Sequence, residues 1–110
     1  MELLFATSDL EAAAQSEGRL QKIFGASARR ACQRLYELAA LETLAAAIAL
    51  PTLDLRPNPG SGRFSVSVSR VHRITFEPIR NAQAGKRVQR LDPASVTSIR
   101  ILSLGGIHDD

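Results

Sequence analysis

The chain has 110 residues, enough for one domain with a modest core, and 45% of them are hydrophobic, which argues against disorder. It lacks the run of about 18 apolar residues that a membrane-spanning helix needs, and its first residues lack the basic start and apolar core of a secretory signal. The single cysteine cannot form an internal disulfide, so we expect a cytoplasmic protein with one domain over residues 1–110 and no membrane contact.

Charge is distributed unevenly along the chain, although the net charge is only +3. Residues 1–55 hold five Lys/Arg and seven Asp/Glu, a net charge of −2, whereas residues 56–110 hold nine and four, a net charge of +5. Eight of these nine cations are arginine, whose planar fork suits phosphate better than a lysine does. The basic half therefore indicates a polyanionic partner, and an ordinary soluble basic surface explains the same composition equally well.

The start of the chain predicts a short strand followed by helices. Residues 2–6 form a short apolar segment, which predicts an edge strand. Ser8 can cap a helix, and Glu11 lies three positions later, as a capping box requires. We expect this alanine-rich helix to end at Gly18 and a second short helix to cover residues 20–24.

The strongest helical pattern runs from residue 27 to residue 49. Apolar residues recur every three or four positions and form one face, at Ala28, Ala31, Leu35, Leu38, Leu41, Leu44 and Ile48. Arg34 falls on or near the opposite face, where it is either a solvated charge or a contact for ribosomal RNA or an acidic antitoxin. Pro51 ends the pattern, because proline disfavours a helical conformation in the preceding residue.

The basic half predicts strands separated by turns. Residues 53–62 are expected to form a loop, because proline and glycine are concentrated there. Residues 63–69 alternate apolar side chains with serine, which is the period of a half-buried strand. Arg70 lies in the tight connection to a second strand at 71–77, and residues 80–94 predict a long exposed loop.

The third strand and the order of the elements indicate the fold class. Residues 96–104 are apolar on both faces, which is typical of a central strand. A strand, then helices, then an antiparallel run of strands predicts an α+β domain, in which a small twisted antiparallel sheet carries the N-terminal helices on one face. The other face is then polar and positive, and it carries Ser65, Ser67, Arg73 and Thr75.

Two motifs in the basic half are distinctive, Phe64-Ser65-Val66-Ser67-Val68 and Arg73-Ile74-Thr75-Phe76-Glu77-Pro78. Leu91-Asp92 and residues 96–102 follow them, and Leu4-Phe5-Ala6-Thr7 and residues 33–38 precede them. In this order and spacing, the motifs resemble the HigB-like toxins, plasmid-maintenance killer proteins of the RelE/ParE superfamily. The resemblance covers nearly the whole chain and implies a RelE/ParE-like fold.

The resemblance also implies a toxin of a type II toxin–antitoxin system. One branch of the superfamily cuts messenger RNA in the ribosomal decoding site, and another branch poisons gyrase without cutting RNA. The expected partners are mRNA, the ribosome and a HigA-like helix-turn-helix antitoxin, through which alone the chain would contact operator DNA. We expect no cofactor and no metal, since this cleavage is metal-free and the sequence has no Cys/His cluster with zinc spacing.

Metal-free RNA cleavage requires a base for the 2′-hydroxyl, cations for the charged transition state and an acid for the leaving oxygen. The resemblance assigns catalytic roles to Arg73, Arg56 and His108. Arg73 matches the strand arginine of the family, and a guanidinium on the polar face can bind a phosphate at two points. Arg63 and Arg70, together with Arg56 and Arg73, are the predicted RNA-binding cations.

Each assignment has a structural alternative. Arg73 could form a cross-strand pair with Glu77 or contact an antitoxin, and His108 could be a frayed tail residue. The loop arginines are equally well explained as solvated charges. His72 is expected to pack on the core side of its strand, and Cys32 to be inert packing on the long helix.

Four positions depart from the family pattern. Leu53 stands where the family has a histidine, Arg56 where it has a lysine, and Gly106 and Ile107 where it has Asp and Tyr. A general acid or base typically contributes about 10²–10⁴ in rate. These losses motivate a second hypothesis, a catalytically weakened module that binds its antitoxin and helps to autoregulate the operon. A ParE-like gyrase inhibitor is the third.

Overall fold

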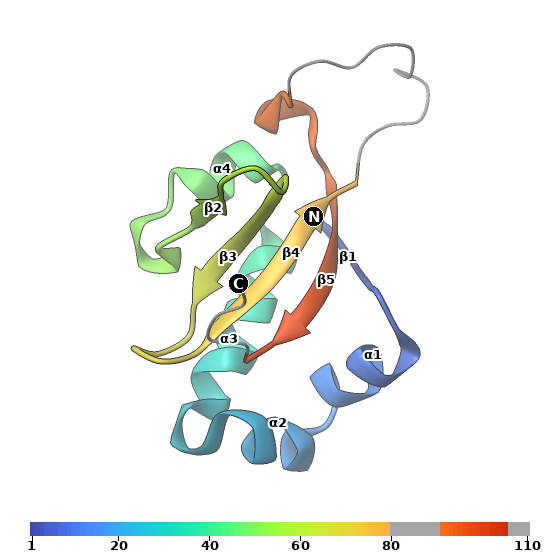
Figure 1. Cartoon of the computed structure of the whole chain (residues 1–110), viewed down its shortest axis with the longest axis vertical. Helices are drawn as coiled ribbons and strands as arrows, with labels where there is room; N and C mark the ends of the chain where they lie inside the picture. Colours follow the sequence, from blue (N-terminus) through green and yellow to red (C-terminus); the bar gives the residue numbers. More distant parts are fainter. Residues whose placement is uncertain (80–90, 106–110) are drawn as a thin grey trace.

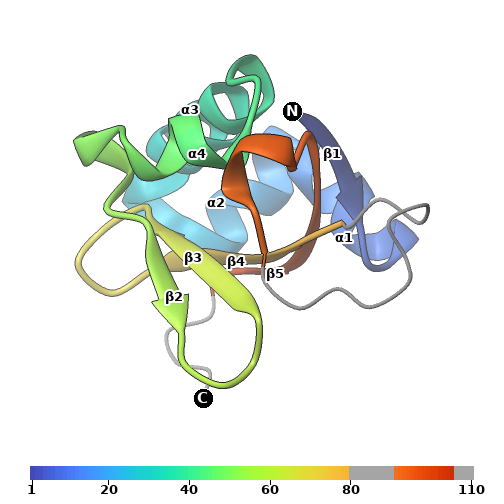
Figure 2. The same ribbon diagram turned by 90° about the horizontal axis from the view of Figure 1, so that it is seen from above.

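A five-stranded sheet with the strand order β1-β5-β4-β3-β2 forms the centre of the fold (Figure 1). The computed structural model describes residues 1–79 and 91–105. Within these residues, the helices and strands are β1 (Glu2–Phe5), α1 (Ser8–Ala14), α2 (Glu17–Phe24), α3 (Ala28–Ala40), α4 (Leu44–Ile48), β2 (Arg56–Asn58), β3 (Arg63–Ser67), β4 (Arg73–Pro78) and β5 (Ser98–Leu104). Figure 2 shows α3 and α4 on one side of the strands, and no helix of the described residues covers the other side. The predicted α+β class is confirmed.

The sheet is mixed, whereas the sequence predicted an antiparallel one. β2, β3, β4 and β5 pair antiparallel in turn, and β1 pairs parallel with β5, with Leu3 opposite Ile99. A parallel pair needs a long crossover, and every other element of the chain lies between β1 and β5. The predicted edge position of β1 and the central position of β5 are both confirmed.

The core lies between the sheet and the helices. Alternation within the strands sends one set of side chains to the helices, and these are fully buried: Val66, Ile74, Phe76, Ile99 and Ile101. The helices contribute Leu20, Phe24, Ala31, Leu35, Leu38 and Leu44 to the same cluster. The rings of Phe64 and Phe76 stack across β3 and β4 with centroids 5.9 Å apart. The period-2 pattern of the sequence therefore identified the buried face of these strands correctly.

The second helix ends at Phe24 as predicted, but the cap of the first helix and the break between the two helices differ from the prediction. Thr7, not Ser8, caps α1, because its hydroxyl oxygen accepts a hydrogen bond from the backbone N–H of Leu10. Ser16 caps α2 in the same way, so the helical break lies before Gly18, which sits inside α2. Side-chain caps thus outweigh the weak helix propensity of one glycine.

The predicted helix over residues 27–49 is two helices. The backbone leaves the helical conformation after α3, and the Thr43 hydroxyl oxygen then accepts from the backbone N–H of Ala46 to start α4. The N–H of Leu44 donates to the carbonyl of Val96, and Leu44 itself is fully buried. The break therefore lets α4 pack against the segment around Val96, which leads to β5. None of the helices in the described part of the chain combines the length and the apolarity needed to cross a bilayer.

The predicted loop over residues 53–62 contains a strand. β2 pairs with β3, so that Arg56 lies opposite Ser65. Pro57 sits within β2, which its position at the edge of the sheet permits. β4 starts at Arg73 instead of residue 71. The predicted loop at 80–94 lies mainly outside the described residues, and its end, Pro93–Ser95, is a 3-10 turn.

Candidate functional site

Three of the predicted arginines share the face of the sheet that the helices leave open. In the strand register, Arg56 lies opposite Ser65 and Arg73 lies opposite Ser67. Paired residues point to the same face, and so do residues two apart on one strand. Arg63, two positions before Ser65 on β3, therefore belongs to this face as well. The predicted polar residues therefore do lie on the face away from the helices, but Ser65 and Thr75 are buried there, with only 6% and 8% of each residue exposed.

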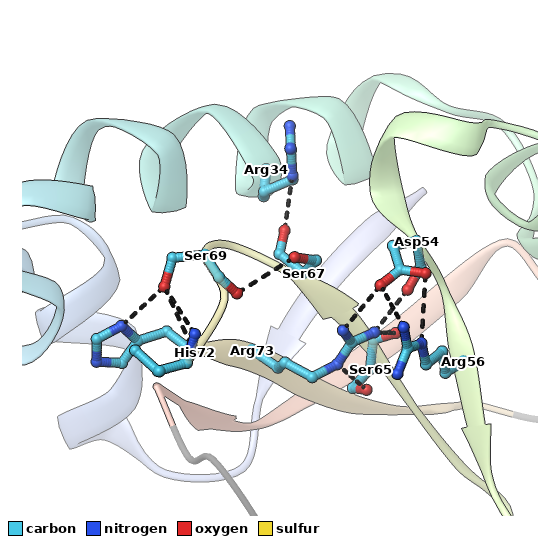
Figure 3. A network of polar contacts seen from close by, with 9 residues as sticks. Arg34, Asp54, Arg56, Ser65, Ser67, Ser69, His72 and Arg73 are labelled. Atoms are coloured by element: carbon cyan, nitrogen blue, oxygen red, sulfur yellow. Dashed lines mark hydrogen bonds and ion pairs between the residues drawn. The ribbon is translucent and has the colours of Figure 1, made fainter.

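Arg73 is held by four hydrogen bonds to the protein (Figure 3). Its Nε donates to the Oγ of Ser65 (2.8 Å), and its Nη1 donates to Oδ2 of Asp54 (3.1 Å). Its Nη2 donates to the backbone carbonyls of Asp54 and Ser65. An arginine has five N–H donors, so one, on Nη1, has no partner within residues 1–79 and 91–105. The side chain is only 20% exposed, which gives Arg73 a structural role in this surface.

Asp54 is the carboxylate around which the site is built. It follows the 3-10 turn Pro51–Leu53 and adopts a left-handed backbone with φ of 47°. Arg56 approaches both carboxylate oxygens, with Nε 3.3 Å from Oδ1 and Nη2 3.1 Å from Oδ2. The hydrogen bond from Arg73 is the main cause that holds the pKa of Asp54 below its usual range. Desolvation opposes it, and the hydrogen bond from Arg56 and the charges of both arginines add to the lowering.

The three charged groups form a series from the inside outwards. The exposed fraction of the side chain rises from 20% at Arg73 to 46% at Asp54 and 66% at Arg56. The group carries two positive charges and one negative charge, so a net positive charge remains at its outer end. Chemically, it can offer a guanidinium fork to an anion at the surface of the sheet. We call Asp54, Arg56 and Arg73 the arginine–carboxylate cluster.

The other predicted site residues lie in different places. Arg63 is exposed at the start of β3, opposite Asn58 of the edge strand β2, and Arg70 is exposed in the turn between β3 and β4. These two residues therefore flank opposite ends of β3, and Arg63 is the one that pairs with β2, the strand that carries Arg56. His108 lies outside the described residues, as do Gly106 and Ile107. Within residues 1–79 and 91–105, no three His, Cys, Asp or Glu side chains gather as metal ligands.

Two structural interpretations of charged residues were wrong. Arg73 does not pair with Glu77, which accepts instead from Nη1 of Arg100 at 2.8 Å. Arg34 is not a solvated charge, because its side chain is 13% exposed and its Nε donates to the carbonyl of Ser67 at 2.8 Å. It ties α3 to the end of β3, a contact between distant segments that helical periodicity does not reveal.

His72 packs as the sequence predicted. Its ring meets Phe24 edge to face, with ring centroids 5.4 Å apart, and its Nδ1 lies 3.1 Å from the Oγ of Ser69. That oxygen also accepts the backbone N–H of His72, which fixes the turn before β4. Cys32 is half-buried against the core cluster, again as predicted.

Sequence reasoning missed Asp54. The available signal was local: an acidic residue stands two positions before the loop arginine and beside a stretch rich in turn-forming residues. Asp is also among the residues that tolerate a left-handed backbone. Neither signal indicates that Arg73, 19 positions away, shares the carboxylate.

The comparisons with known proteins support the fold. A solved structure described as a YoeB/ParE toxin from Agrobacterium tumefaciens matches with a TM-score of 0.51 and 13% sequence identity, over 99% of this chain and 100% of that one. No protein-family model and no curated protein sequence matches. The HigB branch therefore stays a prediction, while the three-dimensional architecture of the chain is similar to that of a YoeB/ParE toxin.

Proposed function

We propose that this chain is the toxin of a type II toxin–antitoxin system and acts as a ribosome-dependent mRNA endoribonuclease. The observation that carries the proposal is the gathering of Arg56, Arg63 and Arg73 on the open face of a sheet whose fold is similar to that of a YoeB/ParE toxin. A face that bears arginines and that no helix of the described residues covers suits a sugar–phosphate strand, because guanidinium groups bind phosphate oxygens at two points. The HigB-like motifs of the sequence favour the RNA-cleaving branch.

The proposed roles follow the exposure of the side chains. Arg56 and Arg63 are exposed and supply the mobile phosphate contacts, whereas Arg73, with one free donor, supplies a fixed positive charge under the strand. Fixed charge near the reacting phosphate stabilises the negative charge of the transition state. His108 is the proposed acid or base, since an imidazole titrates near neutral pH. Arg70 is the least supported RNA contact, because it lies at the other end of β3.

The partners belong to the same proposal. The antitoxin is a HigA-like helix-turn-helix protein that holds the toxin inactive, and operator DNA is contacted only through it. The ribosome presents the mRNA, so that free RNA is a poor substrate. No cofactor or metal takes part.

Expression in a bacterial host with transcript mapping tests the function. Induction of the chain should arrest growth and produce new mRNA 5′ ends that depend on translation, and co-expression of the antitoxin should abolish both. The double variant Arg56→Gln/Arg63→Gln should reduce cleavage at least about 10-fold, since each lost phosphate contact weakens binding. Arg19→Gln is the matched control, because Arg19 pairs with Asp9 on the distant helices α1 and α2. Intact transcripts under growth arrest would reject the nuclease.

One observation favours a second candidate, the catalytically weakened binding module. Arg73 gives four of its five donors to Asp54 and Ser65, so little of its hydrogen-bonding capacity is left for a transition state. Tight antitoxin binding without toxicity would favour this module. Growth arrest with altered plasmid supercoiling and uncut mRNA would favour a gyrase inhibitor.

A further inference from the structure

We propose that the Asp54 carboxylate occupies a phosphate-binding position between Arg56 and Arg73, and that a backbone phosphate of RNA displaces it. This inference rests on the proposed function, because it assumes that RNA is what reaches the open face of the sheet. It makes Asp54 an internal competitor that weakens RNA binding, and the arginine–carboxylate cluster the place where the competition occurs.

The geometry of the cluster is that of an anion site with its anion in place. Nε and Nη2 of Arg56 approach different oxygens of the Asp54 carboxylate, and Nη1 of Arg73 shares one of them (Figure 3). A guanidinium fork binds two non-bridging phosphate oxygens in the same two-point manner. A phosphate that took the place of the carboxylate would therefore meet the same N–H donors without a new arrangement of the strands.

The Asp54 carboxylate can move away from the arginines while Arg73 keeps its other hydrogen bonds. Two of the four hydrogen bonds of Arg73 go to backbone carbonyls and a third goes to the Oγ of Ser65, so only one depends on the Asp54 side chain. Asp54 and Arg56 are 46% and 66% exposed. Exposed ion pairs of this kind shift an equilibrium by only about 1.5- to 5-fold. A polyanion held by several arginines can outweigh so weak a contact.

The opposite interpretation is that the carboxylate only ties the segment before β2 to the sheet. In that case the pair stabilises the fold and has no effect on RNA affinity beyond the change in net charge. The two interpretations differ in what removal of the carboxylate does to binding, which makes them separable in one experiment.

The test measures binding of a fluorescein-labelled, 2′-O-methylated RNA octamer, which cannot be cleaved, to the full chain at low salt. Asp54→Asn should bind about 3- to 10-fold more tightly than the native chain. Asp9→Asn is the matched control, because it makes the same charge change and releases Arg19 from a 2.8 Å ion pair on the helical side; it should change affinity less than about 2-fold. Equal effects of the two variants would overturn the proposal.

Two further measurements sharpen the result. The affinity of Asp54→Asn should depend more steeply on salt, by up to about 0.7 in the logarithmic slope. In that variant Arg56 meets the phosphate as an unpaired cation, whereas in the native chain the displaced carboxylate takes up a counterion and offsets the release. Arg56→Gln should cost at least about 3-fold more affinity in the Asp54→Asn background than in the native chain, because in the native chain the phosphate contact of Arg56 replaces its ion pair with Asp54. Additive effects of the two substitutions would contradict the competition.

A second variant protects the test against misfolding. Asp54→Gly also removes the carboxylate, and glycine is favoured at the φ of 47° that residue 54 adopts. It should reproduce the tighter binding. Failure of this inference is distinct from failure of the proposed function. If the native chain cleaves mRNA but loss of the carboxylate does not tighten RNA binding, only the competition between Asp54 and phosphate is refuted. If loss of the carboxylate tightens binding but no mRNA is cleaved in cells, only the nuclease function is refuted.

Discussion

Arg73→Lys tests how much the hydrogen bonds of this side chain contribute to the stability of the fold. A lysine ammonium has a single nitrogen, so it can keep one contact to Asp54 but loses the bond to the Oγ of Ser65 and at least one carbonyl contact. With about 1 kcal/mol for each net hydrogen bond, two lost bonds predict a destabilisation of about 2 kcal/mol. In a domain of this size, that lowers Tm by roughly 8 °C, at about 4 °C for each kcal/mol.

Urea denaturation followed by circular dichroism measures the loss, and Arg100→Lys is the matched control. Arg100 lies on β5 and makes one contact to Glu77 at 2.8 Å with 43% of its side chain exposed, so a lysine there should cost less than about 0.5 kcal/mol. If Arg73→Lys unfolds at the same urea concentration as Arg100→Lys, the hydrogen bonds of Arg73 contribute nothing to stability. The assignment of Arg73 to a fixed structural position would then be refuted.

Three further predictions concern single positions. Thr43→Ala should cost about 1 kcal/mol in urea denaturation, because the hydroxyl cap of α4 is lost; an unchanged midpoint would refute the cap. Gly105→Ala should lower Tm more than Gly60→Ala, since both have positive φ but only at Gly105 would a Cβ meet Ile23, at 2.6 Å; equal losses would contradict this clash. The depressed pKa of Asp54 stabilises the fold above about pH 4 and this contribution is lost as pH falls through the lowered pKa. Asp54→Asn should remove that part of the acid sensitivity, and parallel stability–pH curves would refute it.

The sheet was predictable where local pattern and burial agree. Alternation from Phe64 to Val68 placed Val66 in the core and Ser65 on the opposite face, and both placements are observed, although Ser65 is also buried, at 6% exposed. The pattern failed where a long-range contact decides. Leu41 and Leu44 continue the helical period without interruption, yet the helix is interrupted between them. There the N–H of Leu44 donates to the carbonyl of Val96 instead of continuing the helix. No local signal encodes a partner about fifty residues away.

The site divides in the same way. The period of β4 predicted the face on which Arg73 lies, but two of its four hydrogen bonds go to Asp54, which is on a different segment and in a left-handed conformation. Proline in the segment that forms β2 indicated a loop, although an edge strand accepts proline. The sequence pattern therefore did not predict that Arg56 lies in a strand opposite Ser65.

These contacts change which arginine we expect to form the main new contact with RNA. The sequence favoured Arg73, because it matches the family motif and lies on the polar face. In the folded chain, three of its hydrogen bonds anchor it to Ser65 and to the backbone of Asp54. Arg56 is two-thirds exposed, and among the described side chains it is held only by the Asp54 carboxylate. A side chain that is already satisfied gains little from a new anion, whereas an exposed one exchanges one anion for another at small cost. On this reasoning, Arg73 supplies a fixed positive charge, and Arg56 makes the contact that changes when RNA arrives.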